Sequence, residues 1–382
     1  MSAATGSPHG HPPPPPADVG HARAPRRTRV VVVAVCAALA LLAGVAWRPA
    51  PARLPAETAG DAALGQLGRE LIGDDRPALA VACVTPAGTR TAVMGAQATD
   101  RFEIGSISKG LTGLLFADMI ERGEVRADTR LGSLLPVSGA LAGVTLSELA
   151  THTSGLPVQL PTTGQVGRNY RASLTAGNPY DGSVQQRLDA LGGVSPDAPP
   201  GTYSNLGFEL LGAALAAAAD RPYRDLLRER VLVPTGLAEA TVPYADRELT
   251  TGDLLGQTAG GRTADAWVGP ALAPAGGVRA DIEEMAGLAQ RLLTGQAPGI
   301  DALKPKADAD GSPTGWAWIT SPAPGSERQV TWHNGGTGGF TSFLGIDPER
   351  RTGVVVLSAR QESPNATTLA GFELLERIGD CS

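Results

Sequence analysis

Ser106 and Lys109 are the first residues of this chain whose spacing could support chemistry, in the segment EIGSISKGL. If a helix begins at Ser106, the lysine amine lies beside the serine hydroxyl, because positions three apart share a helix face. A serine hydroxyl becomes a strong nucleophile when a base removes its proton, and lysine can be that base once burial lowers its pKa. Only three of the 32 basic residues are lysines, and arginine cannot lose its charge. The pair therefore predicts nucleophilic catalysis.

The Ser-x-x-Lys spacing is not specific by itself, since about one chance match is expected in a chain of this length. The alternative interpretation is a capping serine at the start of a helix, followed by a surface lysine. Catalysis therefore requires further motifs, and a fold that brings them to the same place.

A second motif, Tyr203 and Asn205, follows a Pro-Pro-Gly turn in the segment PPGTYSNLGFELLG. One interpretation is ordinary helix entry, with Asn205 as the N-cap and Tyr203 packed nearby. The functional interpretation places the Tyr203 hydroxyl near Ser106 and the Asn205 amide on a substrate carbonyl.

The third motif lies where a strand enters a glycine-rich turn, in VTWHNGGTGGFTSFLGID. A strand without side chains lets a ligand approach closely, so its backbone could hydrogen-bond a substrate amide. The alternative is a glycine-rich hairpin with an exposed histidine. The candidate residues are His333, Asn334, Gly335, Gly336 and Thr337.

Several other classes of function are disfavoured. The net charge is −6 and the first 29 residues contribute +3, so the remainder carries −9, which argues against nucleic acid as a partner. After residue 47 only two histidines remain, His152 and His333, and no cysteine cluster occurs, so we expect no metal. Neither a G-x-S-x-G motif nor a phosphate or dinucleotide fingerprint is present, and we expect no cofactor. His152, in THTSGLP, is expected to fix a turn rather than to catalyse.

Strands are predicted at both ends of the globular part and helices between them. This order predicts a mixed α/β (α+β) fold in which one antiparallel sheet receives both ends and a helical region, about 120–265, is inserted. Strand patterns occur in PALAVACVTPAGTRTAVMG, GWAWITS, RQVTWHN, GFTSFLGID and TGVVVLSA. Helices are predicted for DAALGQLGRELIGD, SKGLTGLLFADMIERGEV, TLSELATH, SVQQRLDALGG, LGFELLGAALAAAA, YRDLLRERVL, DIEEMAGLAQRLLTG and ATTLAGFELLERIG.

Residues 30–47 form an uncharged apolar stretch at the lower length limit for a membrane-spanning helix. More arginines precede it than follow it, which predicts that the N-terminus stays inside and the main body outside. We expect an uncleaved transmembrane signal anchor; the alternative is a signal peptide cleaved near Ala46, giving a secreted protein. Residues 1–29 are expected to be a disordered cytoplasmic tail, 48–60 a Pro/Ala linker, and 61–382 one exported domain.

The three cysteines leave one question open. Cys36 lies in the apolar stretch, whereas Cys83 and Cys381 belong to the exported part. Export permits a disulfide between these two, and a pair of buried or free thiols is equally compatible with the sequence.

In order and spacing, the three motifs resemble those of the serine β-lactamase and penicillin-binding family, in particular its class C β-lactamase and D-alanyl-D-alanine carboxypeptidase branch. That branch carries S-x-x-K, then Y-x-N, then K/H-x-G on a strand. The phrases LSELATHTSGLP, PPGTYSNLGFELLG and PAGGVRADIEEMAGLAQRLLTG are also similar, and the resemblance covers about residues 65–378. It implies a β-lactamase-like fold, with an antiparallel sheet flanked by helices, a helical subdomain, and the site between them.

The resemblance also implies a role for each motif. Ser106 would form an acyl-enzyme, and Lys109 and Tyr203 would share the proton transfers. Asn205 would hold the substrate amide, and the backbone N–H groups of Ser106 and Gly336 would bind the oxyanion. Water would then release the product, without a metal or organic cofactor. The strand and turn residues that would line the substrate site are His333, Asn334, Gly335, Gly336 and Thr337.

Two positions depart from the family pattern. His333 stands where many β-lactamases have lysine, and Asn334 where threonine or serine is usual, so a substrate carboxylate would be held less firmly. We expect carboxylate affinity to fall as pH rises through the titration of His333. The leading substrates are peptidoglycan D-Ala-D-Ala peptides or β-lactams; an esterase, or a penicillin-binding sensor that acylates without turnover, are the alternatives. Loops in residues 155–200 and 240–275 are expected to set specificity.

Overall fold

The computed structural model describes residues 31, 35, 36, 49–180, 182–199 and 201–378. The chain divides into two units, residues 1–48 and residues 49–382, and the second contains nearly all of the described residues. The tail expected at 1–29 and most of the membrane segment expected at 30–47 lie outside the described residues. Within the part of the chain that the structure describes, no helix has the length and apolar character needed to cross a membrane.

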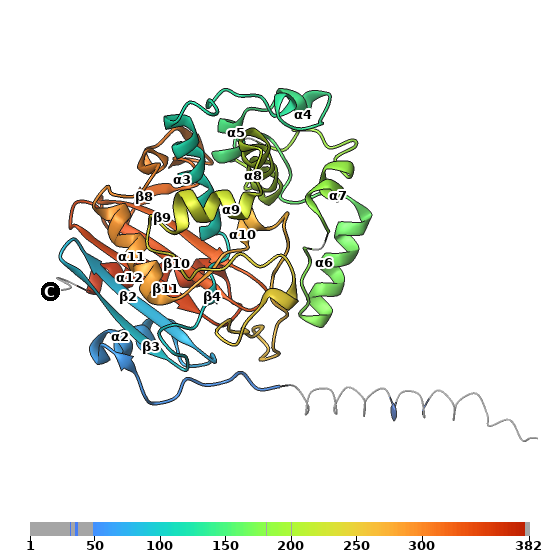
Figure 1. The fold of residues 1–382 in the computed structure, drawn as a ribbon. Helices are drawn as coiled ribbons and strands as arrows, with labels where there is room; N and C mark the ends of the chain where they lie inside the picture. Colours follow the sequence, from blue (N-terminus) through green and yellow to red (C-terminus); the bar gives the residue numbers. More distant parts are fainter. Residues whose placement is uncertain (1–30, 32–34, 37–48, 181, 200, 379–382) are drawn as a thin grey trace, which may run out of the picture. The chain divides into compact units, whose positions relative to one another are not determined.

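A nine-stranded antiparallel sheet occupies the centre of residues 49–382 (Figure 1). Its order is β1-β3-β2-β11-β10-β9-β8-β7-β6, so a strand from the start of the domain lies beside one from its end. This confirms that one sheet receives both ends. A separate pair joins β4 (Phe102–Glu103) to β5 (Arg279–Ala280). The sheet strands are β1 (Ala59–Gly60), β2 (Leu79–Thr85), β3 (Gly88–Met94), β6 (Ala307–Ala309), β7 (Ser312–Thr314), β8 (Ile319–Pro322), β9 (Gln329–Gly336), β10 (Thr341–Asp347) and β11 (Thr352–Ser358).

The central strands are apolar on both faces, so both faces of the sheet are covered. Along β2, Leu79 and Val81 belong to one apolar cluster, and Ala80 and Ala82 to the other, because successive side chains of a strand point in opposite directions. Helices α2 (Ala62–Ile72) and α12 (Pro364–Arg377) pack on the first face. Helix α11 (Ile282–Leu293) packs on the second face, with α3 (Ile107–Glu121).

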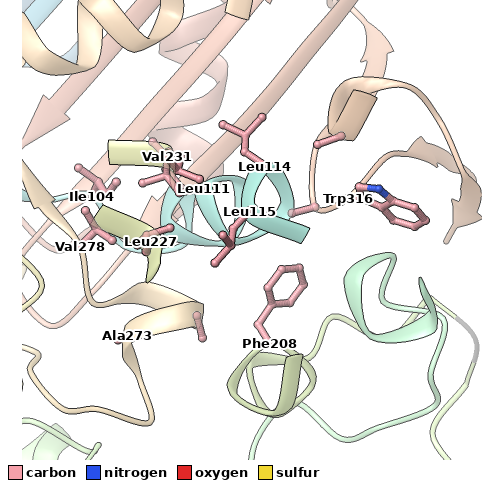
Figure 2. Packing of buried hydrophobic residues seen from close by; sticks show 14 of the residues in the cluster. Ile104, Leu111, Leu114, Leu115, Phe208, Leu227, Val231, Ala273, Val278 and Trp316 are labelled. Carbon is pink, nitrogen blue, oxygen red and sulfur yellow. The ribbon is translucent and has the colours of Figure 1, made fainter. Parts of the chain in front are cut away.

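Helix α3 is buried from its first turn to its last, which makes it a rigid support for the residues at its start. Figure 2 shows Leu111, Leu114 and Leu115 of this helix between Phe208 on one side and Trp316 on another. All three leucines have no exposed surface. Such burial removes them from water on every side, at roughly 1.5–3 kcal/mol for each side chain.

The regular elements between α3 and α11 are helices, as expected, apart from β5, and long loops join them. The most apolar of these helices, α8, begins just after Tyr203 and packs against α3. The helices of this stretch are η1 (Leu131–Ser133), α4 (Ala140–Gly143), α5 (Leu146–Ala150), α6 (Thr163–Thr175), α7 (Val184–Asp189), α8 (Asn205–Ala219), α9 (Tyr223–Leu227), η2 (Arg228–Leu232), η3 (Asp246–Glu248) and α10 (Ala273–Gly276), and η4 (Ile300–Leu303) follows α11.

The structure differs from expectation in several elements. Helix α6 was not predicted, because it carries few apolar residues and those at positions 166, 170 and 174 are exposed. Strands β6 and β7 were also missed, and only the end of GWAWITS is a strand, in β8. The expected linker at 48–60 is partly built into the domain, since Leu54 is buried and residues 59–60 form the edge strand β1.

Cys83 lies in β2, fully buried, and is disulfide-bonded. The other cysteine considered for this bond, Cys381, lies outside the described residues. Cys36 is a free, exposed cysteine.

Candidate active site

Ser106 lies at the start of α3, where the chain passes from the β4 region into the helix. The residue before it, Gly105, has φ of +51°, a backbone conformation that a side chain strains. A Cβ atom at Gly105 would also lie 2.7 Å from the backbone nitrogen of Gly336, on β9. Glycine therefore allows the nucleophile's turn and strand β9 to approach this closely.

Lys109 lies one helical turn after Ser106, as the spacing predicted. Its Nζ donates a hydrogen bond to Ser106 Oγ at 3.0 Å and another to the Ala275 carbonyl oxygen, in α10, at 2.5 Å. The side chain is fully buried, and burial lowers the pKa of Lys109 to about 7, although the nearby Glu209 carboxylate opposes the decrease. Near neutral pH this amine is therefore able both to take and to return a proton.

Tyr203 completes the group around the nucleophile. Its phenol is hydrogen-bonded to Ser106, and Lys109 Nζ lies 4.8 Å from the centre of its ring. One side of the residue stays open, with 37% of its surface exposed. Its packed surroundings nevertheless raise the pKa of the phenol, because they disfavour the charged form, while the bond to Ser106 lowers it by a smaller amount. The proton of Tyr203 therefore remains on the phenol at neutral pH.

His152 supports Tyr203 from behind rather than joining the catalytic group. Its Nδ1 accepts a hydrogen bond from the Ser204 N–H at 3.0 Å, and its ring lies 4.5 Å from the Tyr203 ring. Its φ is +59°, in a turn. Burial and the charge of Lys109 hold the pKa of His152 well below its usual value, so the ring is neutral. This arrangement agrees with the expected turn role.

Asn205 is the first residue of α8, and the structure shows that Ser204, not Asn205, is the N-cap. Freed from capping, the Asn205 side chain donates from Nδ2 to the Tyr180 hydroxyl at 3.0 Å. That hydroxyl also accepts from Gln159 Nε2 at 2.7 Å, and burial raises the pKa of Tyr180 to about 12. Tyr180 therefore fixes the amide of Asn205 at the edge of the cleft, a role that the sequence did not predict.

Strand β9 presents its backbone to the site. Its pairing with β8 ends at Trp332, so the next residues have a free edge on that side.

The hydrogen-bond register of β9 with β10 determines how Gly336 is oriented. Thr337 N–H donates to the Phe340 carbonyl oxygen in the turn to β10. Bonded and non-bonded pairs alternate along an antiparallel ladder, which turns the N–H and C=O of Gly336 away from β10 and toward the free edge. Since Gly336 N also lies against Gly105, it can bind an oxyanion together with Ser106 N–H.

His333 faces the site but carries no charge there. It is almost fully buried, and its Nδ1 lies 2.6 Å from the Asn334 carbonyl oxygen. Burial and the positive charge of Lys109 lower the pKa of His333 to about 3. The expected titration of His333 in the range of pH 5 to 8 is therefore wrong, because the protonated form would be a second buried cation beside Lys109.

Two of the other expected substrate-binding side chains do not reach the cleft. Asn334 lies on the opposite face of β9 and donates from Nδ2 to Thr368 of α12 at 2.8 Å. Thr337 is buried, and its hydroxyl accepts from the Phe340 N–H within the turn. The expected side-chain contacts of these two residues with a substrate are therefore wrong. Successive side chains of a strand point to opposite faces, which turns Asn334 toward α12, and the Thr337 hydroxyl is used within the turn. Gly335 packs so tightly that an added Cβ would lie 2.2 Å from the Ile104 carbonyl oxygen.

Both loops expected to set specificity line one hollow near the turn after β9. This cavity, of about 240 Å³, is lined by Gln159 and Asn169 from the first loop and by Thr258 and Trp267 from the second, together with Gly338. Trp267 packs against Tyr180 with ring centres 5.1 Å apart, which connects the cavity wall to Asn205.

One charged residue of α8 was overlooked in the sequence. Glu209 lies one helical turn after Asn205 and is the single charged residue in the helix NLGFELLGAALAAAA. A lone acid in an otherwise apolar helix was the signal that could have identified it. It is buried, and its carboxylate lies 3.6 Å from Nε of Arg187, in α7.

The arrangement as a whole supports acyl transfer. A serine hydroxyl contacts a buried amine and a phenol, and the backbone nitrogen of Gly336 lies against Gly105, the residue before the serine. Among the residues that the structure describes, no group of three or more His, Cys, Asp or Glu side chains could hold a metal ion.

Comparison with known proteins agrees with this geometry. A family profile described as Beta-lactamase matches residues 65–376. The D-alanyl-D-alanine-carboxypeptidase/endopeptidase AmpH of Escherichia coli (strain K12) is 26% identical over 282 residues, 67% of this chain and 70% of that protein. A β-lactamase of the same organism is 26% identical over 324 residues, 72% of this chain and 80% of that protein. The crystal structure of a class C β-lactamase from Rhodobacter sphaeroides superimposes with a TM-score of 0.70 at 21% identity, over 83% of this chain and 99% of that one.

Proposed function

Because this chain belongs to the beta-lactamase family and is a serine hydrolase, we propose that it cleaves an amide bond through an acyl-enzyme on Ser106, in the manner of a D-alanyl-D-alanine carboxypeptidase. The observation that carries the proposal is the contact of Ser106 Oγ with both Lys109 Nζ and the phenol of Tyr203. The name of the relative AmpH supports the choice of a D-Ala-D-Ala peptide over other amides.

The proton path follows from the pKa values. Neutral Lys109, whose pKa is about 7, accepts the Ser106 proton as Oγ attacks the substrate carbonyl carbon. The oxyanion forms against the N–H groups of Ser106 and Gly336. Tyr203 is protonated when the oxyanion forms, because its pKa is raised. It then donates this proton to the leaving amine and receives the proton that Lys109 took from Ser106. Water then attacks the acyl-enzyme, and the same groups take a proton from the water and return one to Ser106 Oγ.

A second candidate, ester hydrolysis, is favoured by the uncharged state of β9. His333 is neutral, and the side chains of Asn334 and Thr337 are turned elsewhere. A substrate carboxylate would therefore meet no cation and no free hydroxyl from these three residues. An ester or amide without a carboxylate at that position does not need them.

We further propose that the domain acts outside the cell membrane, held by the apolar stretch at residues 30–47. The support is the sequence alone, in the length of the stretch and the excess of arginines before it. Release after cleavage near Ala46 is the alternative. Expression of the full chain followed by membrane fractionation tests this point: recovery of the intact chain in the membrane supports the anchor, and a shortened soluble form supports cleavage.

The reaction type is tested by offering residues 49–382 two substrates, a D-Ala-D-Ala peptide and a neutral ester, with a penicillin as a trapping reagent. Release of D-alanine together with a penicilloyl adduct, seen in the intact mass, supports the peptidase. Ester cleavage without D-alanine release or adduct supports the second candidate. Loss of neither substrate, from folded protein, contradicts both.

A further inference from the structure

A chain of side-chain hydrogen bonds leads from a buried arginine toward Asn205, and the chemistry described above does not use it. Arg187, in α7, donates from Nη1 to Gln165 Oε1 at 2.7 Å. Gln165 Nε2 donates to Asn169 Oδ1 at 2.8 Å, one turn further along α6. Asn169 Nδ2 then donates to Gln159 Oε1, in the loop before α6, at 2.6 Å. Helices α6 and α7 are thereby joined to the loop that lines the cavity near the turn after β9.

The direction of these bonds is set at the arginine. A guanidinium can only donate, so Gln165 turns its amide oxygen toward Arg187, and Nη2 of Arg168 donates to the same oxygen at 2.7 Å. The nitrogen of Gln165 therefore has to meet an acceptor, which fixes the orientation of the Asn169 amide. The same reasoning fixes the amide of Gln159, whose nitrogen is left to donate at the far end of the chain of bonds.

Tyr180 accepts the last of these bonds. Its hydroxyl oxygen accepts from Gln159 Nε2 at 2.7 Å and from Asn205 Nδ2 at 3.0 Å. Tyr180 is buried, its backbone N–H donates to Asn178 Oδ1 at 2.9 Å, and its ring packs against Trp267. The hydroxyl is therefore fixed in position, and the Asn205 amide is held by contacts that begin at α7.

The hydrogen bond to Tyr180 leaves part of the Asn205 amide available. Among the described residues, the Asn205 side chain makes no other hydrogen bond. A side-chain amide has two N–H donors and an oxygen that accepts. One N–H and the oxygen of Asn205 can therefore bind the C=O and N–H groups of another amide. A substrate that complements Asn205 carries an amide in its acyl group, whereas a simple acyl ester carries none.

We propose that the chain of hydrogen bonds from Arg187, ending at Tyr180, positions the Asn205 amide and so selects substrates that carry an amide beside the scissile carbonyl. The inference rests on the proposed function. A side chain already held in its binding orientation loses little conformational entropy when a substrate binds, so its hydrogen bonds contribute more to affinity. Gln159 and Tyr180 act through Asn205 without touching the reacting atoms, so they are positioning residues.

The test offers the full-length protein two esters of the same phenol. The benzoylglycyl ester has an amide beside the scissile carbonyl, and the 4-phenylbutanoyl ester has two methylene groups in its place, at the same length. Because the amide also makes the first ester more reactive, each kcat/KM is divided by the rate of spontaneous hydrolysis of that ester. The ratio of the two corrected values is the specificity ratio, and the unmodified chain is expected to favour the benzoylglycyl ester by about 10-fold or more.

Tyr180→Phe keeps the ring and removes the hydroxyl. We expect the specificity ratio to fall about 5-fold, the effect of one hydrogen bond, while kcat/KM for the 4-phenylbutanoyl ester stays within about twofold. Gln159→Leu is expected to lower the ratio by less. Since both changes act through one hydroxyl, the double variant should fall no further than Tyr180→Phe alone. Tyr170→Phe, on the exposed face of α6, is the matched control.

Asn169→Leu interrupts the chain of bonds at α6, three bonds before Asn205. It is expected to lower the specificity ratio by about twofold, because Gln159 loses the donor that orients its amide. Asn169 is exposed, so the change is compatible with folding. Gln185→Leu, at an exposed position of α7, is the control and should leave the ratio unchanged.

An unchanged specificity ratio in folded, active Tyr180→Phe overturns the inference and leaves the proposed function intact, as does a ratio near one in the unmodified chain. A purely structural role would lower kcat/KM for both esters alike, so the ratio would not move, which also overturns the inference. A ratio that falls in Tyr180→Phe but not in Asn169→Leu overturns the part of the inference that begins at Arg187. Cleavage of neither ester by the unmodified chain rejects both this inference and the proposed function.

Discussion

The start of helix α3 and the end of strand β9 face the same cleft but contribute to it in different ways. At α3 the side chains of Ser106 and Lys109 point inward and meet Tyr203. At β9 the side chains of Asn334 and Thr337 are used for packing and turn formation, and Gly336 offers its backbone. The comparison indicates that bond cleavage depends on specific side chains, whereas substrate contact along β9 depends mainly on the backbone, which accepts many acyl groups.

The largest expected effect is at the buried base. Lys109→Met is expected to lower the rate of Ser106 acylation by about 10²–10⁴-fold, the usual contribution of a general base. The unfolded chain holds a lysine proton up to its ordinary pKa, whereas folded Lys109 releases it near pH 7. Between those values the unfolded state binds more protons, so this residue destabilises the fold most at low pH. Lys109→Met should therefore raise the free energy of unfolding at pH 6, measured in urea.

Lys304→Met is the matched control for that change, since Lys304 is an exposed lysine paired with Asp301. It should leave both the acylation rate and the stability nearly unchanged. A Lys109→Met protein with an unchanged acylation rate would show that bond cleavage does not depend on the side chains at the start of α3.

Tyr203→Phe removes the second proton carrier and is expected to lower turnover by about 10²-fold, with a smaller change in KM. The readout is kcat and KM for the same ester or peptide. Tyr170→Phe, on the exposed face of α6, is the control and should be silent. Equal turnover in Tyr203→Phe and the unmodified chain would assign all proton transfer to Lys109.

Gly105→Ala tests the approach between the two regions. The new Cβ would meet Gly336 N at 2.7 Å, so β9 must shift and the oxyanion donors separate. We expect a rate loss of about 10-fold or more, with a strain of about 1–2 kcal/mol from the left-handed backbone. Gly123→Ala shares the positive φ but has no neighbour within 4 Å, so it should show the strain without the rate loss. Equal rate losses in the two variants would contradict the account of β9.

Asn334→Ala is expected to have the smallest effect. It removes the hydrogen bond to Thr368, at about 1 kcal/mol, and should leave KM within about twofold. The KM for a carboxylate-bearing substrate should also show no step from His333 between pH 5 and 8, since the pKa of His333 is about 3. A large rise in KM for Asn334→Ala, or a step in KM between pH 5 and 8, would show that side chains of β9 do contact the substrate.

How much the sequence could predict differs between the same two regions. The contact between Ser106 and Lys109 was predictable because it depends only on helix spacing. The direction of Asn334 was not, since a shift of one residue along a strand exchanges its faces, and nothing local indicates which face meets α12. Tyr180 was missed because it lies in a loop and reaches Asn205 only through the folded chain.

The helices show a similar division. The apolar pattern of α8 was sufficient to predict it, although its cap fell on Ser204 rather than Asn205. Helix α6 has an exposed apolar row and is anchored by Gln165, through polar contacts that no hydrophobic period reveals. The order of strands was predictable only as far as both chain ends entering one sheet, because register depends on contacts distant in sequence.

The most direct test of the central claim is to locate the covalent adduct. Domain protein is treated with a fluorophosphonate probe, digested with trypsin, and the peptide FEIGSISK, residues 102–109, is sequenced by tandem mass spectrometry. The account predicts the adduct on Ser106 and none on Ser108, whose hydroxyl is buried and accepts from Val278 N–H. It also predicts loss of the adduct in Ser106→Ala. An adduct that persists in Ser106→Ala, or that maps to another residue, would contradict the assignment of Ser106 as the nucleophile.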